Sequence, residues 1–358
     1  MSSIALRASS THCNAEMKNM ATNEEFLTAK KEMSKRYLSK ATPQAFTTFA
    51  AAAPLNAAQN IVGVGVGNKI TDEGETNQRC IRFYVAQKIH KDSLNAKQMI
   101  PPTIDGLPTD VIVSGRFRMF GTAENNKLKK RPIQPGTSIG FAFPPPRNNF
   151  VMAGTFGAIA TKNGKRYILS NNHVLAENGR IAIGASIFQP GLLDGGNSAT
   201  DKVAKLSEFV EIKPTGLNRV DCALAEIAAG ISVNARHMPS VGKLSSTAPV
   251  AAADGMLVMK TGRTTGHTRG KVVDVAADVN VGFEDKDGVE FVATFADQIL
   301  IVGQPGSFSD GGDSGSLIVD RATKRATGLL FAGSASHTIG NHIADVLAAL
   351  GVTLETAR

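Results

Sequence analysis

A serine between glycines near the C-terminal end is the residue best suited to chemistry. Segment 311–316 reads GGDSGS and is followed by the apolar, strand-like run LIVD. A tight turn of this kind exposes the hydroxyl of Ser314, and its small residues let the peptide N–H groups of Gly312 and Ser314 converge on one point. Convergent N–H groups stabilise the oxyanion that forms during acyl transfer. The motif therefore predicts a nucleophilic serine with an oxyanion hole.

A serine hydroxyl is a weak nucleophile near neutral pH and needs a base, usually a histidine that a carboxylate holds in one tautomer. His173 directly follows YILSNN, an apolar run that ends on small polar residues. Asp221 directly precedes the apolar run CALAEI, where a buried carboxylate needs a partner. Each of these residues alone is most often structural. Together, in the chain order His173, Asp221, Ser314, they predict a catalytic triad.

Other patterns that could suggest a cofactor are interpreted as structural. The glycines of IVGVGVGNKI at 61–70 do not form GxGxxG and indicate close approach of a packing neighbour, and GRTTG at 262–266 is interpreted as a turn that supports the cleft. His337 and His342 lack a carboxylate or cysteine that would complete a metal site. Cys222 is expected to be buried and unreactive. We therefore expect no metal and no cofactor.

The composition excludes several classes of protein. The chain has 358 residues, of which 42% are hydrophobic, so it can form a packed core. Its net charge is +8, but the basic residues are scattered and the cluster KLKKR at 127–131 is interpreted as a solvated linker, so no nucleic-acid partner is expected. Three distant cysteines offer no disulfide framework, and neither a membrane span nor a secretory segment is found. These features favour a cytoplasmic protein.

Three segments of the chain differ in pattern. Residues 1–58 combine a loose tail, a helix over 22–40 that begins with a capping box, and a linker rich in Ala, Thr and Pro. Residues 59–125 predict a small α+β domain that begins with a hairpin over 61–89. Residues 126–358 alternate short apolar runs with turn residues and end in HIADVLAALG, which predicts an all-β domain with one C-terminal helix.

Taken together, these motifs resemble the chymotrypsin/trypsin-like serine proteases. The similarity is greatest to the intracellular trypsin-like proteins that include the plant narrow-leaf proteases and their bacterial relatives. It rests on VGVGVGNKI near residue 61, RPIQPGTSIG at 131–140, and the runs GTFGAIA, YILSNNHVLA, IFQPGLLDGG, VMKTGRTTGHTRG, GDSGSLIVD and GLLFAGS. The resemblance covers roughly residues 60–352.

The resemblance implies a mainly β fold of two six-stranded antiparallel β-barrels, preceded by the small α+β domain and the helical N-terminal segment. The triad would lie in the cleft between the barrels, with His173 and Asp221 from the first barrel and Ser314 from the second. His173 would act as general base and then as general acid, Asp221 would orient it, and Gly312 and Ser314 would form the oxyanion hole. The implied activity is that of a serine endopeptidase acting on a protein or peptide through an acyl-enzyme.

The chain departs from the family pattern in two respects. It lacks the Ile-Val-Gly-Gly site whose cleavage frees an amine for the carboxylate before the nucleophile, which is Asp313 here. Either Asp313 finds another partner or the enzyme is competent without processing. The disulfides of the secreted relatives are also missing, which fits an intracellular protein.

The primary specificity pocket is inferred from the same family pattern. Its floor lies about six residues before the nucleophile, which gives Phe308, and its opposite wall is the strand Phe331-Ala332-Gly333. An uncharged floor favours small or medium apolar side chains, because burying an uncompensated guanidinium is costly. A shift of the loop by two residues would instead bring Asp310 to the floor and favour Arg or Lys.

Two alternatives stay open from the sequence. One is a non-catalytic peptide-binding or scaffold protein built on a protease fold. The other is a regulated protease that residues 1–58 hold inactive until a partner docks. The sequence names neither the physiological substrate nor the number of subunits, so a homo-oligomer is also left open. Deletion of residues 1–58 is expected to leave a folded core, because that segment contains only one short helix.

Overall fold

The computed structural model describes residues 21–40, 60–71, 73–87, 89, 94, 98–115, 117, 126–148, 150–235, 237–284 and 289–355. Strands dominate these residues, so the predicted mainly β class is confirmed. The predicted tail over 1–20, the linker over 41–58 and the domain boundary near 125 lie outside the described residues.

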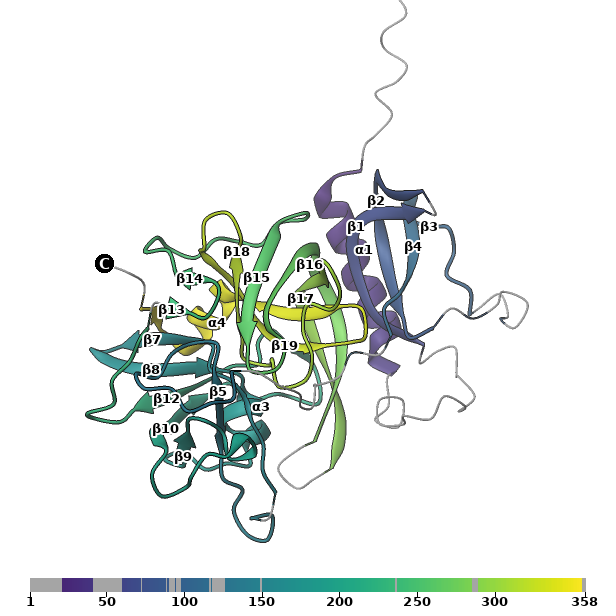
Figure 1. Ribbon diagram of the computed structural model, residues 1–358. Coiled ribbons are helices and arrows are strands. Elements are labelled where there is room, and N and C mark those ends of the chain that lie inside the picture. The colour runs from purple at the N-terminus through teal and green to yellow at the C-terminus, as the bar shows by residue number, and fades with distance from the viewer. Residues whose placement is uncertain are drawn as a thin grey trace, which may run out of the picture.

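One sheet has eight strands, drawn mainly in teal in Figure 1. Its order is β21 (Thr353–Leu354), β7 (Ala158–Lys162), β8 (Lys165–Ser170), β12 (Ala223–Ile227), β10 (Lys202–Phe209), β9 (Ser186–Phe188), β5 (Ser138–Phe141) and β6 (Gly154–Thr155). Only two residues separate β6 from β7 along the chain, so the segment that pairs with β5 at one end of the row also pairs with β8 near the other. The inner side chains of these strands form one apolar cluster.

The second large sheet has eleven strands. Its order is β11 (Leu217–Asn218), β17 (Glu290–Gly303), β20 (Thr338–His342), β19 (Ala326–Gly333), β18 (Leu317–Asp320), β15 (Leu257–Gly262), β16 (Gly266–Glu284), β1 (Ile61–Thr71), β2 (Gly74–Val85), β4 (Leu107–Val113) and β3 (Thr103–Ile104). Because β16 also pairs with β17, the pairings from β17 through β20, β19, β18 and β15 to β16 close on themselves. A separate pair consists of β13 (His237–Met238) and β14 (Gly242–Lys243).

The sheet sizes differ from the predicted six strands in each of two barrels. The hairpin of β1 and β2 does not stand apart but pairs with β16, with Gly63 opposite Val279 and Val64 opposite Asp278. Short strands at the edges, such as β3, β11 and β21, raise the numbers further. The two-barrel arrangement and the division of the chain into three domains therefore stay predictions.

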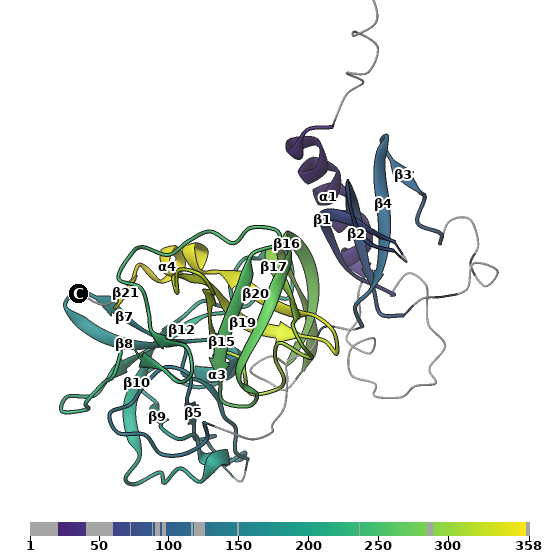
Figure 2. The ribbon, with the colours of Figure 1, turned by 45° about the horizontal axis from the view of Figure 1, so that its top comes forward.

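The N-terminal helix forms where the sequence predicted it. α1 (Asn23–Tyr37) continues into the 3-10 turn η1 (Leu38–Lys40), and the predicted capping box is present because the Thr22 side chain accepts from the Glu25 N–H at 3.3 Å while the Thr22 N–H donates to Glu25 Oε2 at 2.6 Å. The helix lies on β1 and β2 in both views (Figures 1 and 2), where Phe26, Met33 and Leu38 are buried in a shared apolar cluster. The helix is therefore part of a core, and the expectation that a chain without residues 1–58 still folds stays a prediction.

The glycine-rich strand β1 is a place of close packing, as the sequence indicated. A Cβ on Gly65 would lie 1.8 Å from the Asp274 carboxylate of β16, and a Cβ on Gly67 would lie 2.5 Å from the Arg82 guanidinium of β2. Neither carboxylate nor guanidinium could stay in place beside a larger residue. The alternation of Val and Gly thus packs apolar side chains on one face of β1 and admits buried charged groups on the other.

The two sheets meet in a further apolar cluster that supports the site. Leu169 and Leu224 from the first sheet pack with Leu317 and Leu329 from the second. The C-terminal helix α4 (Ile343–Leu350) covers this cluster and ends, as predicted, at Gly351, whose φ of 60° suits glycine. Residues from both halves of the chain are thereby brought to one place.

Candidate active site

His173 and Asp221 lie side by side because two strands pair. β8 and β12 are antiparallel with Ser170 opposite Ala223, so the end of β8 meets the start of β12. His173 follows β8 in the short helix α3 (Asn172–Leu175), and Asp221 immediately precedes β12. The His173 Nδ1 atom lies 2.5 Å from Asp221 Oδ2.

The Asp221 carboxylate is fixed on both of its oxygens and is fully buried. Oδ1 accepts from the Asn172 N–H at 2.7 Å and from the His173 N–H at 3.3 Å, which leaves Oδ2 for the imidazole. The peptide N–H of Asp221 donates to Asn341 Oδ1 at 2.9 Å, and its carbonyl accepts from Asn171 Nδ2 at 2.8 Å. A carboxylate held in this way keeps the proton of a neutral His173 on Nδ1 and leaves Nε2 as an acceptor.

Ser314 is placed at the end of β8 through a shared residue, Thr155. The Thr155 N–H donates to the Ser314 carbonyl at 2.8 Å, and the Thr155 carbonyl accepts from Ser170 Oγ, also at 2.8 Å. Ser170 is the last residue of β8, three positions before His173. The structure therefore brings the turn of Ser314 to the strand end that carries His173.

The hydroxyl of Ser314 is not bonded to the histidine in this structure. Ser314 Oγ donates to the carbonyl of Phe331 at 3.3 Å, and its residue is 2% exposed. His173 Nε2 is buried and has no hydrogen-bond partner among the described residues. The structure thus contains a hydrogen bond between His173 and Asp221 but shows none between Ser314 and His173.

The turn around Ser314 presents two free N–H groups. Gly312 has a φ of 86°, a left-handed conformation that favours glycine. The N–H groups of Asp313 and Gly315 donate to the carbonyls of Asp310 and Leu330, whereas those of Gly312 and Ser314 donate to no other described residue. The two N–H groups predicted to form the oxyanion hole therefore have no hydrogen-bond partner among the described residues.

The partner of Asp313 is a buried lysine that the sequence interpretation missed. Lys260 Nζ on β15 lies 3.0 Å from Asp313 Oδ2, and both side chains are 0% exposed. Burial lowers the pKa of Lys260, and the neighbouring Asp313 charge opposes that effect. The signal in the sequence is a single lysine inside the apolar run LVMK, where a buried charge requires a partner.

The turn GRTTG, interpreted from the sequence as a support for the cleft, binds the loop that carries Ser314. Asp313 Oδ1 accepts from the N–H groups of Thr264 at 2.9 Å and Thr265 at 3.1 Å, and Thr265 Oγ1 donates to Asp313 Oδ2 at 2.6 Å. The Thr264 hydroxyl donates to the carbonyl of Gly311. Five donors, counting Lys260 and the Asp310 N–H at 3.0 Å, therefore satisfy one carboxylate.

Arg263 packs closely against Gly312 of the same loop. Its guanidinium forms a bidentate ion pair with Asp194, with Nε at 2.5 Å from Oδ2 and Nη2 at 2.6 Å from Oδ1, and both side chains are buried. A Cβ on Gly312 would lie 2.5 Å from the Arg263 Nη1 atom. The close approach of this guanidinium is a second reason why only glycine fits at 312.

The residues predicted for the primary pocket lie mainly in packed cores. The Phe308 side chain is 2% exposed and packs in an apolar cluster with Val258, Val272, Ile299, Ile301, Ile318 and Leu330. Phe331 and Ala332 belong to another cluster, in which the Phe331 ring lies 4.7 Å from that of Phe295. Gly333 pairs with Thr338 in the sheet. Asp310 is exposed, and its carboxylate accepts from the Gly311 N–H at 2.7 Å.

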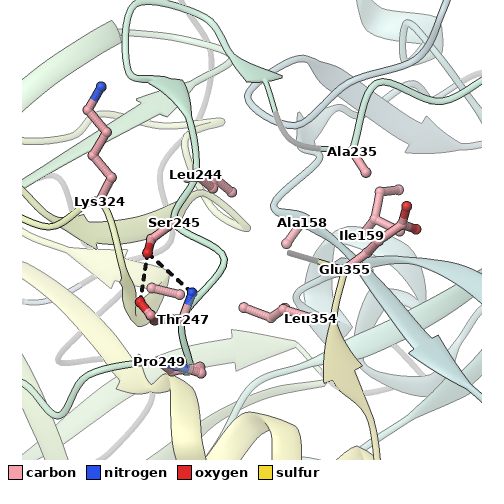
Figure 3. Close-up of a pocket in the computed structure, with 11 residues that line it drawn as sticks. Ala158, Ile159, Ala235, Leu244, Ser245, Thr247, Pro249, Lys324, Leu354 and Glu355 are labelled. Carbon is pink, nitrogen blue, oxygen red and sulfur yellow. Dashed lines mark hydrogen bonds between the residues drawn. The ribbon is translucent and has the colours of Figure 1, made fainter. Parts of the chain in front are cut away.

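Other features of the described residues lie apart from this site. Figure 3 shows a pocket between Ala158, Leu244, Lys324 and Leu354, with hydrogen bonds between Ser245 and Thr247. Its free volume of about 10 Å³ is near the minimum for one water molecule, and no predicted site residue lines it.

Within the described residues, neither the thiols nor any group of metal-binding side chains forms a second site. Cys222 is buried, and burial raises its pKa well above the usual value; burial also raises the pKa of Cys80 to about 11. Across the described ranges, no group of three or more His, Cys, Asp or Glu side chains is placed to hold a metal ion. None of the described helices has both the length and the apolar character of a membrane span.

Comparisons with known proteins find similarity to NARROW LEAF 1 in sequence and to serine proteases in fold. The sequence profile of the family described as Nal1 C-terminal domain matches residues 211–341. The protein NARROW LEAF 1 of Oryza sativa subsp. japonica is 26% identical over 313 residues, which covers 77% of this chain and 51% of the rice protein. The chain thus spans about half the length of this curated relative.

The similar solved structures are chymotrypsin/trypsin-like serine proteases. Thermobifida fusca Protease A has 16% identity and a TM-score of 0.43, and the match covers 63% of this chain and 99% of that one. A glutamic acid specific serine protease has 21% identity and a TM-score of 0.40, with 62% and 100% covered. An alpha-lytic protease homologue has 22% identity and a TM-score of 0.39, with 62% and 99% covered. At these values the similarity assigns no role to a residue of this chain.

Proposed function

We propose that this chain is a serine endopeptidase in which His173, Asp221 and Ser314 form the catalytic triad. The observation that carries the proposal is the buried pair of His173 Nδ1 and Asp221 Oδ2 at 2.5 Å, whose free Nε2 atom has no other described partner. A buried polar atom without a partner is costly in a protein that does not use it. The free Nε2 atom is what a general base requires.

The reaction follows from these groups. Ser314 Oγ attacks the carbonyl carbon of a peptide bond while His173 Nε2 takes the hydroxyl proton, and Asp221 stabilises the imidazolium that forms. The N–H groups of Gly312 and Ser314 receive the oxyanion. His173 then gives the proton to the leaving amine, which leaves an acyl-enzyme. A water molecule, activated by the same histidine, releases the acid and restores the serine.

The strand pairings support the placing of the triad between two barrels. The six strands from β15 to β20 close on themselves, and β5 to β10 with β12 nearly do so through the segment at 154–162. Ser314 lies within the second set, between β17 and β18, whereas His173 and Asp221 lie within the first. The proposed substrate is a protein or peptide in the cytoplasm, as the sequence suggested.

One observation favours a second candidate, a non-catalytic peptide-binding protein. Ser314 Oγ donates to the Phe331 carbonyl and not to His173. Rotation of the serine about its Cα–Cβ bond is needed before the proton can pass, and catalytic hydrogen bonds often tighten only when substrate binds. If the rotation does not occur, the free N–H groups could still bind a peptide carbonyl without cleaving it.

Hydrolysis of a fluorescent protein substrate separates the two candidates. The full chain should release peptides, and Ser314→Ala and His173→Ala should each reduce the rate to background while the melting temperature stays close to that of the parent. Ser307→Ala, an exposed serine in the preceding loop, serves as the matched control and should keep full activity. Binding of peptides by the parent chain without cleavage would support the scaffold and overturn the protease.

A further inference from the structure

A lysine of the N-terminal helix is buried against the strands of the protease half. Lys30 on α1 is 0% exposed, and its Nζ atom lies 2.7 Å from Asp278 Oδ1 on β16 and 2.7 Å from Asp297 Oδ1 on β17. A fully buried lysine is rare unless paired, because removing its charge from water is costly. Through Lys30, helix α1 therefore forms ion pairs with two strands that are more than two hundred residues away in the chain.

Lys30 binds β17 at a β-bulge. Ala277 pairs with Gln298 and Val279 with Phe295, so that two residues of β17 face Asp278 alone. The extra residue, Asp297, has a φ of 54°, which is unfavourable for a residue other than glycine. Its N–H donates to Asp278 Oδ1 at 2.9 Å, the same oxygen that Lys30 binds. Lys30 therefore ties the two carboxylates together and holds the bulge in its strained conformation.

The residue after the bulge begins a chain of buried amides that ends at Asp221. Gln298 Nε2 donates to the Arg219 carbonyl at 2.9 Å, and Gln298 Oε1 accepts from Asn341 Nδ2 at 2.7 Å. Asn341 Oδ1 in turn accepts from the Asp221 N–H at 2.9 Å. Gln298, Asn341 and Asp221 are all 0% exposed, so water cannot replace these bonds.

A second connection runs through a side chain at the surface. Arg219 binds Asp297 Oδ2 with one nitrogen and Asp345 Oδ2 with another at 2.9 Å. The Arg219 side chain is 50% exposed, so solvent screens this connection. The pKa of Asp297 lies below its usual value. Burial raises this pKa, but the hydrogen bond and charge of Lys30, together with the charge of Arg219, lower it by more than burial raises it. The buried amide route is therefore the stronger of the two.

We propose that Lys30 is a positioning residue that links α1 to the active site. By fixing the β17 bulge, it sets the place of Gln298 and Asn341, and these hold the backbone of residues 219–221 so that the Asp221 carboxylate meets His173. In this arrangement α1 supports the active geometry, in contrast to the inhibitory role that the sequence left open for residues 1–58. The proposal rests on the proposed triad and adds to it a required contribution from the N-terminal helix.

Three full-length variants test this link by kinetics. Lys30→Met should lower kcat at least tenfold and leave KM within about twofold, because substrate contacts are untouched. Lys31→Met, the exposed neighbour on the same helix, should leave both constants unchanged. Met33→Ala loosens the same helix without touching a charge, and it should keep kcat at temperatures well below its own unfolding. Equal kcat values for Lys30→Met and Met33→Ala, each measured at the same margin below unfolding, would overturn the proposal.

Should Lys30→Met fail to fold, the double variant Lys30→Met/Asp278→Asn removes the unpaired buried carboxylate as well. It should fold, because Asp278 is no longer charged and Asp297 keeps its ion pair with Arg219, and it should still show the loss in kcat, because the buried cation that ties residues 278 and 297 together is gone. Normal kcat in the folded double variant would overturn the proposal.

A readout without catalysis separates this proposal from the proposed function. The ring 15N and 1H shifts of His173, assigned by their loss in His173→Ala, report the Nδ1–H hydrogen bond to Asp221. They should move in Lys30→Met and stay in place in Lys31→Met. If the parent chain cleaves no substrate but these shifts respond, the protease assignment fails and the link stands. If the shifts do not respond in Lys30→Met, the link fails whatever the activity of the parent chain.

Discussion

Lys260 forms a fully buried ion pair with Asp313, the residue before Ser314, with Nζ 3.0 Å from Oδ2. In the serine proteases that this chain resembles, an amine freed by cleavage pairs with the carboxylate before the nucleophile. Here a side chain on β15 supplies the cation, and Thr264 and Thr265 complete the set of donors. We infer that the loop is held in its folded conformation without any cut in the chain.

Removal of this lysine should be strongly destabilising. Lys260→Met leaves the Asp313 carboxylate buried without a cation, and breaking a buried pair in this way costs about 3–5 kcal/mol of unfolding free energy. Urea denaturation followed by circular dichroism measures the loss. Lys271→Met is the matched control, because its ion pair with Glu75 is about a third exposed, and such pairs contribute roughly 0–1 kcal/mol.

A double variant separates the contribution of charge to stability from that of packing at the Lys260–Asp313 pair. Lys260→Met/Asp313→Asn removes both charges and should regain most of the stability lost in the single variant. A double variant as unstable as Lys260→Met alone would show that the packing of the lysine stem, and not its charge, holds the loop.

Asp221→Asn should fold and lose most of its activity. The asparagine keeps the shape of the carboxylate but favours the wrong imidazole tautomer, and the same change in the well-studied serine protease triad costs about 10⁴ in kcat. Steady-state hydrolysis of a peptide substrate measures the loss. Glu226→Gln, an exposed carboxylate on the adjoining strand β12, should change kcat by less than about twofold. A similar kcat for both variants would remove Asp221 from the mechanism.

The free energy of unfolding should fall more steeply with rising pH when His337 is replaced. Burial, together with the charge of Arg82, lowers the pKa of His337 from 6.5 to about 4. Between these values the unfolded chain binds a proton that the folded chain does not, so His337 makes stability rise with pH. Burial raises the pKa of Asp274 from 3.8 to about 7, so this carboxyl group makes stability fall with pH over nearly the same range.

In the parent chain these two contributions largely cancel. His337→Gln removes the rising one, so its unfolding free energy should fall with pH between 4.5 and 6.5 more steeply than that of the parent, by up to about 1.4 kcal/mol per pH unit. Urea titrations at several pH values measure both slopes. Parallel slopes for the two proteins would show that His337 titrates normally in the folded chain.

Cleavage specificity should be for uncharged residues. The Phe308 ring lies in an apolar cluster, Phe331 and Ala332 are buried, and the exposed Asp310 carboxylate is bound to the Gly311 N–H. Asp310 carries the one carboxylate among these predicted pocket residues, and its bond to the Gly311 N–H opposes a turn toward a substrate guanidinium, so the proposed protease should prefer small or medium apolar side chains. Mass spectrometry of a digested peptide library measures the preference. Cuts mainly after Arg or Lys would show that Asp310 moves into the pocket.

The sequence was sufficient wherever a short segment determined the result. The capping box of α1, the hairpin of β1 and β2, and the end of α4 at Gly351 depend on neighbours within a few residues, and all three are present. His173 and Asp221 are predicted as partners from their residue types, their chain order and the family resemblance, and the antiparallel pairing of β8 with β12 explains why they meet.

The long-range charge pairs could not be predicted from the sequence. Lys30 looks like any lysine of an amphipathic helix, and its partners are more than two hundred residues away. Lys260 is recognisable in the sequence only as a charged residue in an apolar strand. This pattern predicts that a buried partner of opposite charge exists, but it does not identify that partner. The orientation of Phe308 likewise depends on strands β16 and β18, whose positions no local pattern determines.

The most direct test of the account is labelling with a fluorophosphonate probe followed by peptide mapping. The probe phosphonylates only a serine that a base has activated, with loss of fluoride, so the reaction requires the hydrogen bond from Ser314 to His173 that this structure lacks. We expect one adduct per chain, on Ser314, and none in His173→Ala. An unlabelled parent chain, or an adduct on another residue, would contradict the assignment of Ser314 as the nucleophile.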